Sequence, residues 1–163
     1  MEIATTRFGR IEIKEEKMIR MTQGILGFPD ERRYVLLPHR EGSSFFWLQS
    51  VDRPELAFVV ISPFLFAPDY SFDIPDAVER ELEIERREQV DVLVLVTIPA
   101  GNPRAMTANL LGPLVINVER RLGRQLVLDP NRYPLQHPLI PDAAPSPGEP
   151  AAAGEGHKAA GAG

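Results

Sequence analysis

Short apolar runs dominate the first 130 residues of the chain and predict β-strands rather than long helices. The run VDVLVLVTI at 90–98 carries β-branched residues at alternate positions, which is typical of a strand buried on both faces. Strands are predicted at residues 2–6, 10–13, 18–22, 33–38, 45–51, 56–62, 90–98 and 125–129. Their close spacing, with turn residues between them, predicts an all-β barrel or sandwich.

One helix is predicted in the middle of the chain. Ile74, Val78 and Leu82 fall at i, i+4 and i+8, which places them on one stripe of a helix. Pro75 suits a first helical turn, and the pattern predicts a helix that runs to about Arg87. The domain is therefore expected to be mainly β with one or two short helices.

The end of the chain has a different composition. From Pro141 onward alanine is the only hydrophobic residue type, and such a segment cannot offset a backbone ordering cost of about 1–2 kcal/mol per residue. We expect a folded domain at 1–140 and a disordered Ala/Gly/Pro-rich tail at 141–163.

Charge and composition narrow the possible functions. The net charge of the chain is −5, and residues 69–91 alone carry −6, from nine acidic residues and three arginines. Such a run is either a solvated helix face or a surface that attracts a basic partner. A nucleic-acid binder usually has a basic face, so no direct nucleic-acid binding is expected. No apolar run reaches the ~20 residues that span a bilayer, and no membrane association is expected.

Residues that could do chemistry are scarce. The chain has no cysteine, and His39, His137 and His157 lie far apart, without the spacing of metal ligands. No phosphate-binding loop or nucleophile motif is present. The carboxylates of 69–91 would need burial to work as acids or bases, and nothing indicates that burial. We therefore expect no catalytic activity, no cofactor and no metal.

The segment TANLLGPLVIN at 107–117 contains two apolar pieces separated by Gly112-Pro113. Pro113 has no N–H, so it should break a strand or bend it from one sheet to the next. Asn109 and Asn117 are expected to cap the backbone groups that the bend leaves free. Either this is a structural corner, or Asn109, Leu110 and Pro113 lie at an accessible edge where a partner binds.

A second candidate interface is the segment FLFAPDYSFDIPD at 64–76. Its phenylalanines are most simply residues that anchor the loop to the core. Asp69, Tyr70 and Asp73 lie between two prolines and predict a loop that presents acid beside an aromatic ring. An interface uses this combination when tyrosine anchors a partner and carboxylates meet its Arg or Lys.

Four longer segments resemble the bacterial flagellar assembly factor FliW family. The most specific matches are the LQS, D, P and LAF residues within 48–58 and the TANL, P and VIN residues within 107–117. The matching segments are 24–37, 45–76, 97–117 and 124–139. The resemblance covers essentially all of 1–140 and leaves out the tail.

The resemblance implies a small barrel-like antiparallel β domain without catalytic activity. It implies a cytoplasmic protein with two protein partners: CsrA, a small basic RNA-binding dimer that represses translation, and flagellin. In this family FliW is thought to weaken RNA binding by CsrA allosterically, and flagellin competes for FliW. The alternative is a β-barrel adaptor with another protein ligand. We expect a monomer, because no exposed apolar stripe demands a second copy.

Overall fold

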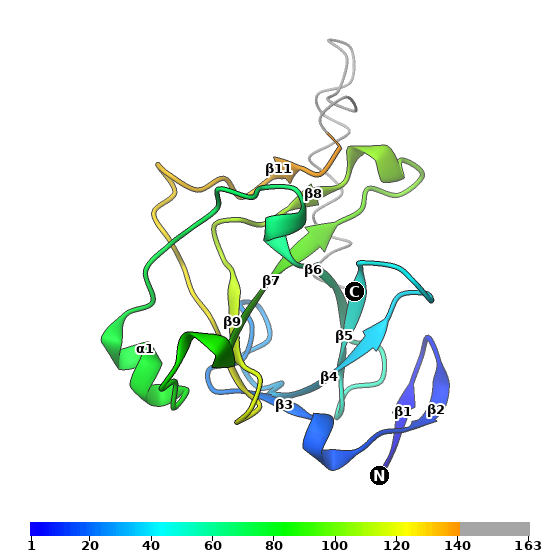
Figure 1. Cartoon of the computed structure of the whole chain (residues 1–163). Coiled ribbons are helices and arrows are strands. Elements are labelled where there is room, and N and C mark those ends of the chain that lie inside the picture. The colour runs from blue at the N-terminus through cyan, green and yellow to red at the C-terminus, as the bar shows by residue number, and fades with distance from the viewer. Residues whose placement is uncertain (141–163) are drawn as a thin grey trace.

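Seven strands form a closed barrel in the computed structural model, which describes residues 1–140. The barrel strands are β3 (Ile19–Met21), β4 (Arg33–Pro38), β5 (Phe46–Ser50), β6 (Ala57–Ile61), β7 (Val90–Thr97), β9 (Leu114–Asn117) and β10 (Leu122–Gln125) (Figure 1). Their order is β7-β6-β5-β4-β3-β10-β9, and pairing of β9 with β7 closes the ring. The predicted mainly β, barrel-like domain is confirmed.

One pair of barrel strands departs from the expected antiparallel arrangement. β10 runs parallel to β3, with Leu122 opposite Arg20 and Gly123 opposite Met21, whereas the other neighbours are antiparallel. Parallel strands need a long connection. About a hundred residues separate β3 from β10, so almost the whole domain serves as that connection.

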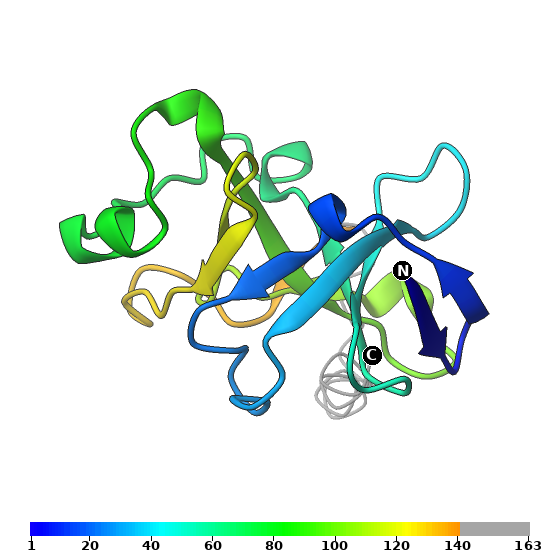
Figure 2. The ribbon, with the colours of Figure 1, turned by 90° about the horizontal axis from the view of Figure 1, so that it is seen from below.

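Shorter elements surround the barrel. β1 (Glu2–Thr5) and β2 (Gly9–Glu12) form a hairpin with its own sheet, and Figure 2 shows it on the opposite side of the barrel from α1. β8 (Thr107–Ala108) and β11 (His137–Pro138) extend the main sheet beyond β7. The helical turns are η1 (Glu15–Lys17), η2 (Pro63–Leu65), α1 (Asp76–Glu81), η3 (Arg87–Gln89) and η4 (Pro103–Ala105).

The strand β7 is buried on both faces, as its apolar run predicted. Leu93 packs into the barrel interior with Leu48 of β5 and Phe58 of β6. Val94 and its neighbours at alternate positions face an outer cluster that includes Tyr70. The second layer comes from the loop at 62–75 and from residues 106–139, which cover the outside of β6 and β7.

Two element boundaries differ from the prediction. The helix occupies only Asp76–Glu81 instead of 74–87, because the chain leaves the helical conformation at Glu83, whose φ is +57°. The last barrel strand lies at Leu122–Gln125 instead of 125–129. The predicted disordered tail at 141–163 lies outside the described residues.

Candidate functional site

The loop at 62–75 holds three of the residues predicted to bind a partner. The turn η2 starts it, with the amide of Ala67 donating to the carbonyl of Pro63, and the amide of Tyr70 donates to Ala67 in turn. This winding exposes Asp69 and Asp73 to solvent. Tyr70 points the other way and is only 9% exposed. The two aspartates are therefore the members of this set that a partner can reach.

The structure brings the two candidate interface segments together through Tyr70. Its hydroxyl donates a 2.7 Å hydrogen bond to the carbonyl oxygen of Leu110. A second tyrosine, Tyr133, packs edge-on against the Tyr70 ring and donates to the carbonyl of Ser71 at 2.6 Å. Burial raises the pKa of Tyr70, so the phenol stays protonated and acts as a donor. Tyr70 thus fastens the loop at 62–75, which we call the acidic loop, to the 107–117 segment.

The break at Gly112-Pro113 is present as predicted, and it separates β8 from β9. The side-chain oxygen of Asn109 accepts hydrogen bonds from the amides of Leu111 and Gly112, at 3.0 and 2.9 Å. Capping by Asn109 is therefore confirmed. The side chains of Leu110 and Pro113 are buried and that of Asn109 is half-buried. Partner binding by these three residues stays a prediction.

Asn117 also caps backbone groups, but at the far end of β9 rather than at the Gly112-Pro113 break. Its amide nitrogen donates to the carbonyls of Leu82 and Glu83, at 2.9 and 3.1 Å. Its oxygen accepts from the amides of Glu119 and Arg120, at 3.0 and 3.1 Å. One fully buried side chain therefore joins the end of the α1 segment to the turn between β9 and β10.

Two adjoining hollows lie beside the acidic loop, with volumes of about 340 and 460 Å³. They share an apolar floor made by Phe72, Ile74 and Val90. Phe64 lines the smaller hollow and is 45% exposed. The carboxylates that line the two hollows belong to Asp73, Glu79, Glu85 and Asp91. We call these eight residues the acidic face.

Two arginines partly offset the negative charge of the acidic face. Arg87 lines both hollows, and Arg86 forms an ion pair with Glu119. That pair raises the pKa of Arg86 and lowers the pKa of Glu119. Arg86 is thus engaged, and the carboxylates outnumber the arginines. Sequence reasoning found the acid but missed the apolar floor, because its residues become neighbours only after folding.

Within residues 1–140, the histidines and carboxylates form no cluster of three or more side chains that could hold a metal ion. The ring of His39 stacks on Trp47, with centroids 5.4 Å apart, and the ring of His137 lies 5.6 Å from that of Phe66. Across the same residues, no helix is long and apolar enough to cross a membrane.

Comparisons with known proteins identify the family. The family model described as FliW protein matches residues 2–139. A flagellar assembly factor FliW from Magnetococcus marinus is 48% identical over 143 residues, which cover 88% of this chain and 87% of that protein. One from Natranaerobius thermophilus is 40% identical over 142 residues, covering 87% and 94%.

A solved structure agrees with these matches. The crystal structure of a flagellar assembly factor FliW superposes with a TM-score of 0.79 at 41% identity, and the match covers 86% of this chain and 98% of that one. The resemblance predicted from the sequence is therefore confirmed over nearly all of the described residues. The chain belongs to the FliW family of flagellar assembly factors.

Proposed function

We propose that this chain is a non-enzymatic regulator of flagellum assembly that binds CsrA and cytoplasmic flagellin in turn. Binding of the chain to CsrA weakens the RNA binding of CsrA allosterically, and binding to flagellin protects unassembled flagellin subunits. Flagellin that accumulates occupies the chain and releases CsrA, which then represses flagellin synthesis. Membership of a family of flagellar assembly factors supports this proposal.

The observation that carries the CsrA half of the proposal is the acidic face. The acidic face combines an apolar floor with four carboxylates. The exposed Asp69 lies on the same loop as Asp73. Carboxylates attract a basic protein from a distance and align it, whereas desolvated apolar groups supply most of the binding energy. A basic dimer such as CsrA fits both requirements.

The flagellin half of the proposal rests on competition between flagellin and CsrA for this chain. Two ligands that exclude each other must share a surface or bias the same element. The 107–117 segment is fastened to the acidic loop through Tyr70 and Leu110, so a ligand at one segment bears on the other. A flagellin end that is unfolded before binding would lose about 2–5 kcal/mol to ordering, which keeps the competition reversible.

The test is a charge reversal on the loop. Asp69→Lys together with Asp73→Lys should weaken CsrA binding more than tenfold in calorimetric titration, with an unchanged circular dichroism spectrum. The matched control is Glu16→Lys with Glu41→Lys, because both side chains are exposed and the change in net charge is the same. Equal weakening in both double variants would mean that net charge and not the loop governs binding.

A further inference from the structure

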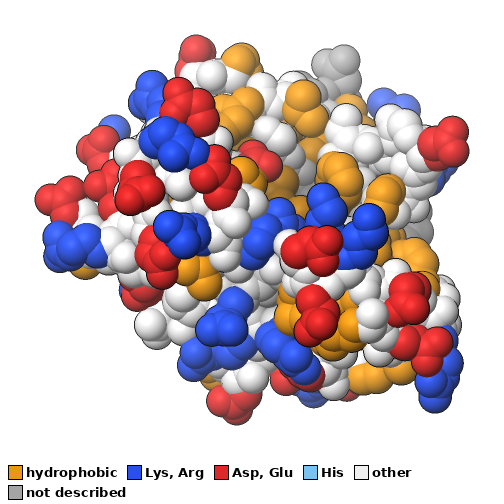
Figure 3. All heavy atoms as spheres, turned by 60° about the horizontal axis from the view of Figure 1, so that its bottom comes forward, with side chains coloured by type: hydrophobic (Ala, Val, Ile, Leu, Met, Phe, Trp, Pro, Cys, Tyr) orange, Lys and Arg blue, Asp and Glu red, His pale blue; other side chains and the backbone are white. Residues whose placement is uncertain are grey.

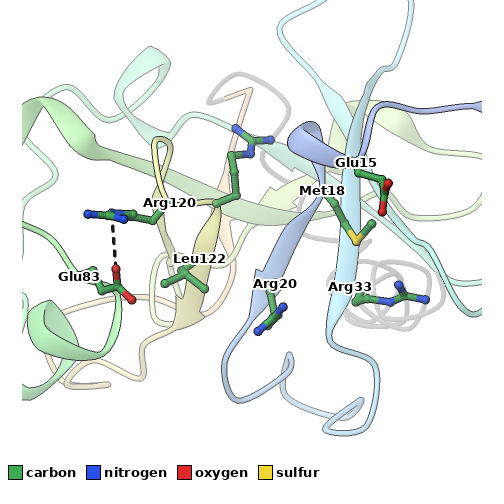
Figure 4. A pocket seen from close by; sticks show the side chains of 8 residues that line it. Glu15, Met18, Arg20, Arg33, Glu83, Arg120 and Leu122 are labelled. Carbon is green, nitrogen blue, oxygen red and sulfur yellow. Dashed lines mark ion pairs between the residues drawn. The ribbon is translucent and has the colours of Figure 1, made fainter. Parts of the chain in front are cut away.

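A further hollow, which shares no lining residue with the acidic face, is basic. It has a volume of about 530 Å³ and opens between η1, β3 and the turn that leads into β10. Figure 4 shows Arg120 and Glu83 on one side of this hollow and Arg33 on the other side of the hollow. Its lining residues are Glu15, Met18, Arg20, Arg33, Glu83, Arg120, Arg121 and Leu122. We call this hollow the arginine pocket.

Four arginines against two glutamates give the arginine pocket an excess of positive charge in a chain whose net charge is −5. Arg20 and Arg33 lie directly opposite each other on β3 and β4, so their side chains leave the sheet on the same face. Arg33 pairs with Asp52, and Arg20 has no ion pair within residues 1–140. Figure 3 shows basic side chains gathered near the middle of this face.

Arg33 is held by two hydrogen bonds to Asp52, but the pair between Arg120 and Glu83, both of which line the pocket, is weaker. The ion pair between Arg120 and Glu83 is 3.5 Å long, and both side chains are more than half exposed. A pair of this kind contributes at most about 1 kcal/mol and opens readily. A carboxylate from outside can therefore replace Glu83 as the partner of Arg120.

The backbone around the arginine pocket is strained and held in place. Within residues 1–140, the non-glycine residues with positive φ are Glu83 and Arg121, both at +57°, and both line this pocket. Each such residue costs roughly 1–2 kcal/mol, and strain of this kind tends to gather at functional sites. Asn117 binds both: its side chain holds the carbonyl of Glu83, and its own carbonyl accepts from the amide of Arg121.

One side-chain donor of Arg121, a residue that lines the pocket, lacks an acceptor. The Nε atom of Arg121 is buried and has no hydrogen-bond partner among the described residues, while another nitrogen of the same guanidinium donates to the carbonyl of Lys17 at 2.6 Å. Burial lowers the pKa of Arg121, because the charged form loses water. An anion bound in the pocket would stabilise the positive charge of this partly desolvated guanidinium.

The lining selects among anions. Met18 and Leu122 add apolar surface, and Glu15 and Glu83 repel a ligand with closely spaced negative charges, such as a nucleic-acid backbone. A peptide with a few carboxylates separated by apolar side chains matches both features. Its planar carboxylates also fit the forked donors of arginine.

From this geometry we infer that the arginine pocket is a second docking site, which takes an acidic segment of a protein partner with apolar residues between its carboxylates. This inference goes beyond the proposed function and does not depend on the acidic face or on the identity of CsrA and flagellin. It gives the chain two docking surfaces of opposite charge.

The test uses the full-length chain and a fluorescein-labelled peptide, Leu-Glu-Leu-Glu-Leu-Glu, followed by fluorescence anisotropy. We expect saturable binding that weakens with added salt, no binding of the peptide with glutamine in place of glutamate, and a loss of roughly tenfold or more in Arg20→Glu and in Arg120→Gln. Arg104→Glu is the matched control, because Arg104 is exposed and lies outside the pocket.

Three results would overturn the inference. The first is no binding of the acidic peptide, and the second is an equal loss in Arg104→Glu. The third is full displacement of the labelled peptide by inorganic phosphate, when unlabelled peptide at the same concentration displaces no more of it. That result would indicate a simple anion site. Circular dichroism and thermal melting of each variant exclude unfolding as the cause of a loss. In the bound state, the side-chain Nε–H resonance of Arg121 should also shift.

Discussion

Asn117 offers the sharpest test of how the end of the α1 segment is held against the turn between β9 and β10. Truncation in Asn117→Ala removes four hydrogen bonds between 2.9 and 3.1 Å. The amides of Glu119 and Arg120 lie in an exposed turn, so water replaces the lost acceptor there. Leu82 is fully buried, and its carbonyl is left without that donor. An unsatisfied buried group costs about 1–3 kcal/mol, and the other bonds add to it, so we expect a loss of roughly 2–4 kcal/mol.

The assay is urea unfolding followed by fluorescence of Trp47, the only tryptophan. Asn109→Ala is the matched control: Asn109 caps two amides from a half-buried position, and its loss should be about 1 kcal/mol. A loss in Asn117→Ala no larger than that of the control would refute the reasoning.

A second variant at this position tests the sign of the interaction. Asn117→Asp keeps the acceptor for Glu119 and Arg120 but points a carboxylate oxygen at the carbonyls of Leu82 and Glu83. Burial and repulsion should raise the folded-state pKa of this aspartate above its unfolded value of about 3.9. The penalty is then full above the folded pKa and shrinks as pH falls toward the unfolded pKa. Relative to the original chain at the same pH, Asn117→Asp should therefore recover stability on acidification. A constant difference would contradict this.

Three further changes probe other parts of the fold. Gly24→Ala should cost roughly 2–4 kcal/mol in urea unfolding, because a Cβ would lie 2.8 Å from backbone atoms at a φ of +72°, whereas Gly42→Ala, at φ +78° in open space, should cost only about 1–2 kcal/mol. Tyr70→Phe should lose about 1 kcal/mol by the same measurement, and an unchanged value would mean that its hydroxyl does not hold the acidic loop. Burial of Glu81 favours its neutral form, but hydrogen bonds that include one from Arg124 outweigh it and lower the pKa. Glu81→Gln should therefore lose stability at pH 7, by about 1 kcal/mol, and this gap should close as pH falls through the folded-state pKa, below about 4.5.

The sequence predicts the strands whose apolar pattern is strong. β4 lies at Arg33–Pro38 as predicted, and β7 differs from its predicted range by one residue. β10 was misplaced because LGRQ has little apolar character, and its position is set by pairing with β3 and β9. Gly123 shows why: a Cβ there would lie 2.7 Å from the sulfur of Met21, so close approach of the strands and not hydrophobicity defines this part of the sheet.

The two surfaces differ in how far the sequence reveals them. The acidic residues of 69–91 lie within one short segment of the sequence, so a charged surface could be predicted from it. The apolar floor of the acidic face joins Phe72 and Ile74 with Val90, which only the fold brings together. The arginines of the arginine pocket are spread from 20 to 121, and no window of the sequence contains them all. Burial of Tyr70 likewise depends on a contact with Leu110, forty residues away.

The measurement that tests the account most directly is calorimetric titration of the full-length chain with CsrA, first alone and then with saturating flagellin. The account predicts binding to CsrA and to flagellin separately, and loss of the CsrA signal when flagellin is present. Undiminished CsrA binding in the presence of flagellin would contradict the partner switch. Binding to neither protein would leave a FliW-family barrel that acts as an adaptor for another protein ligand.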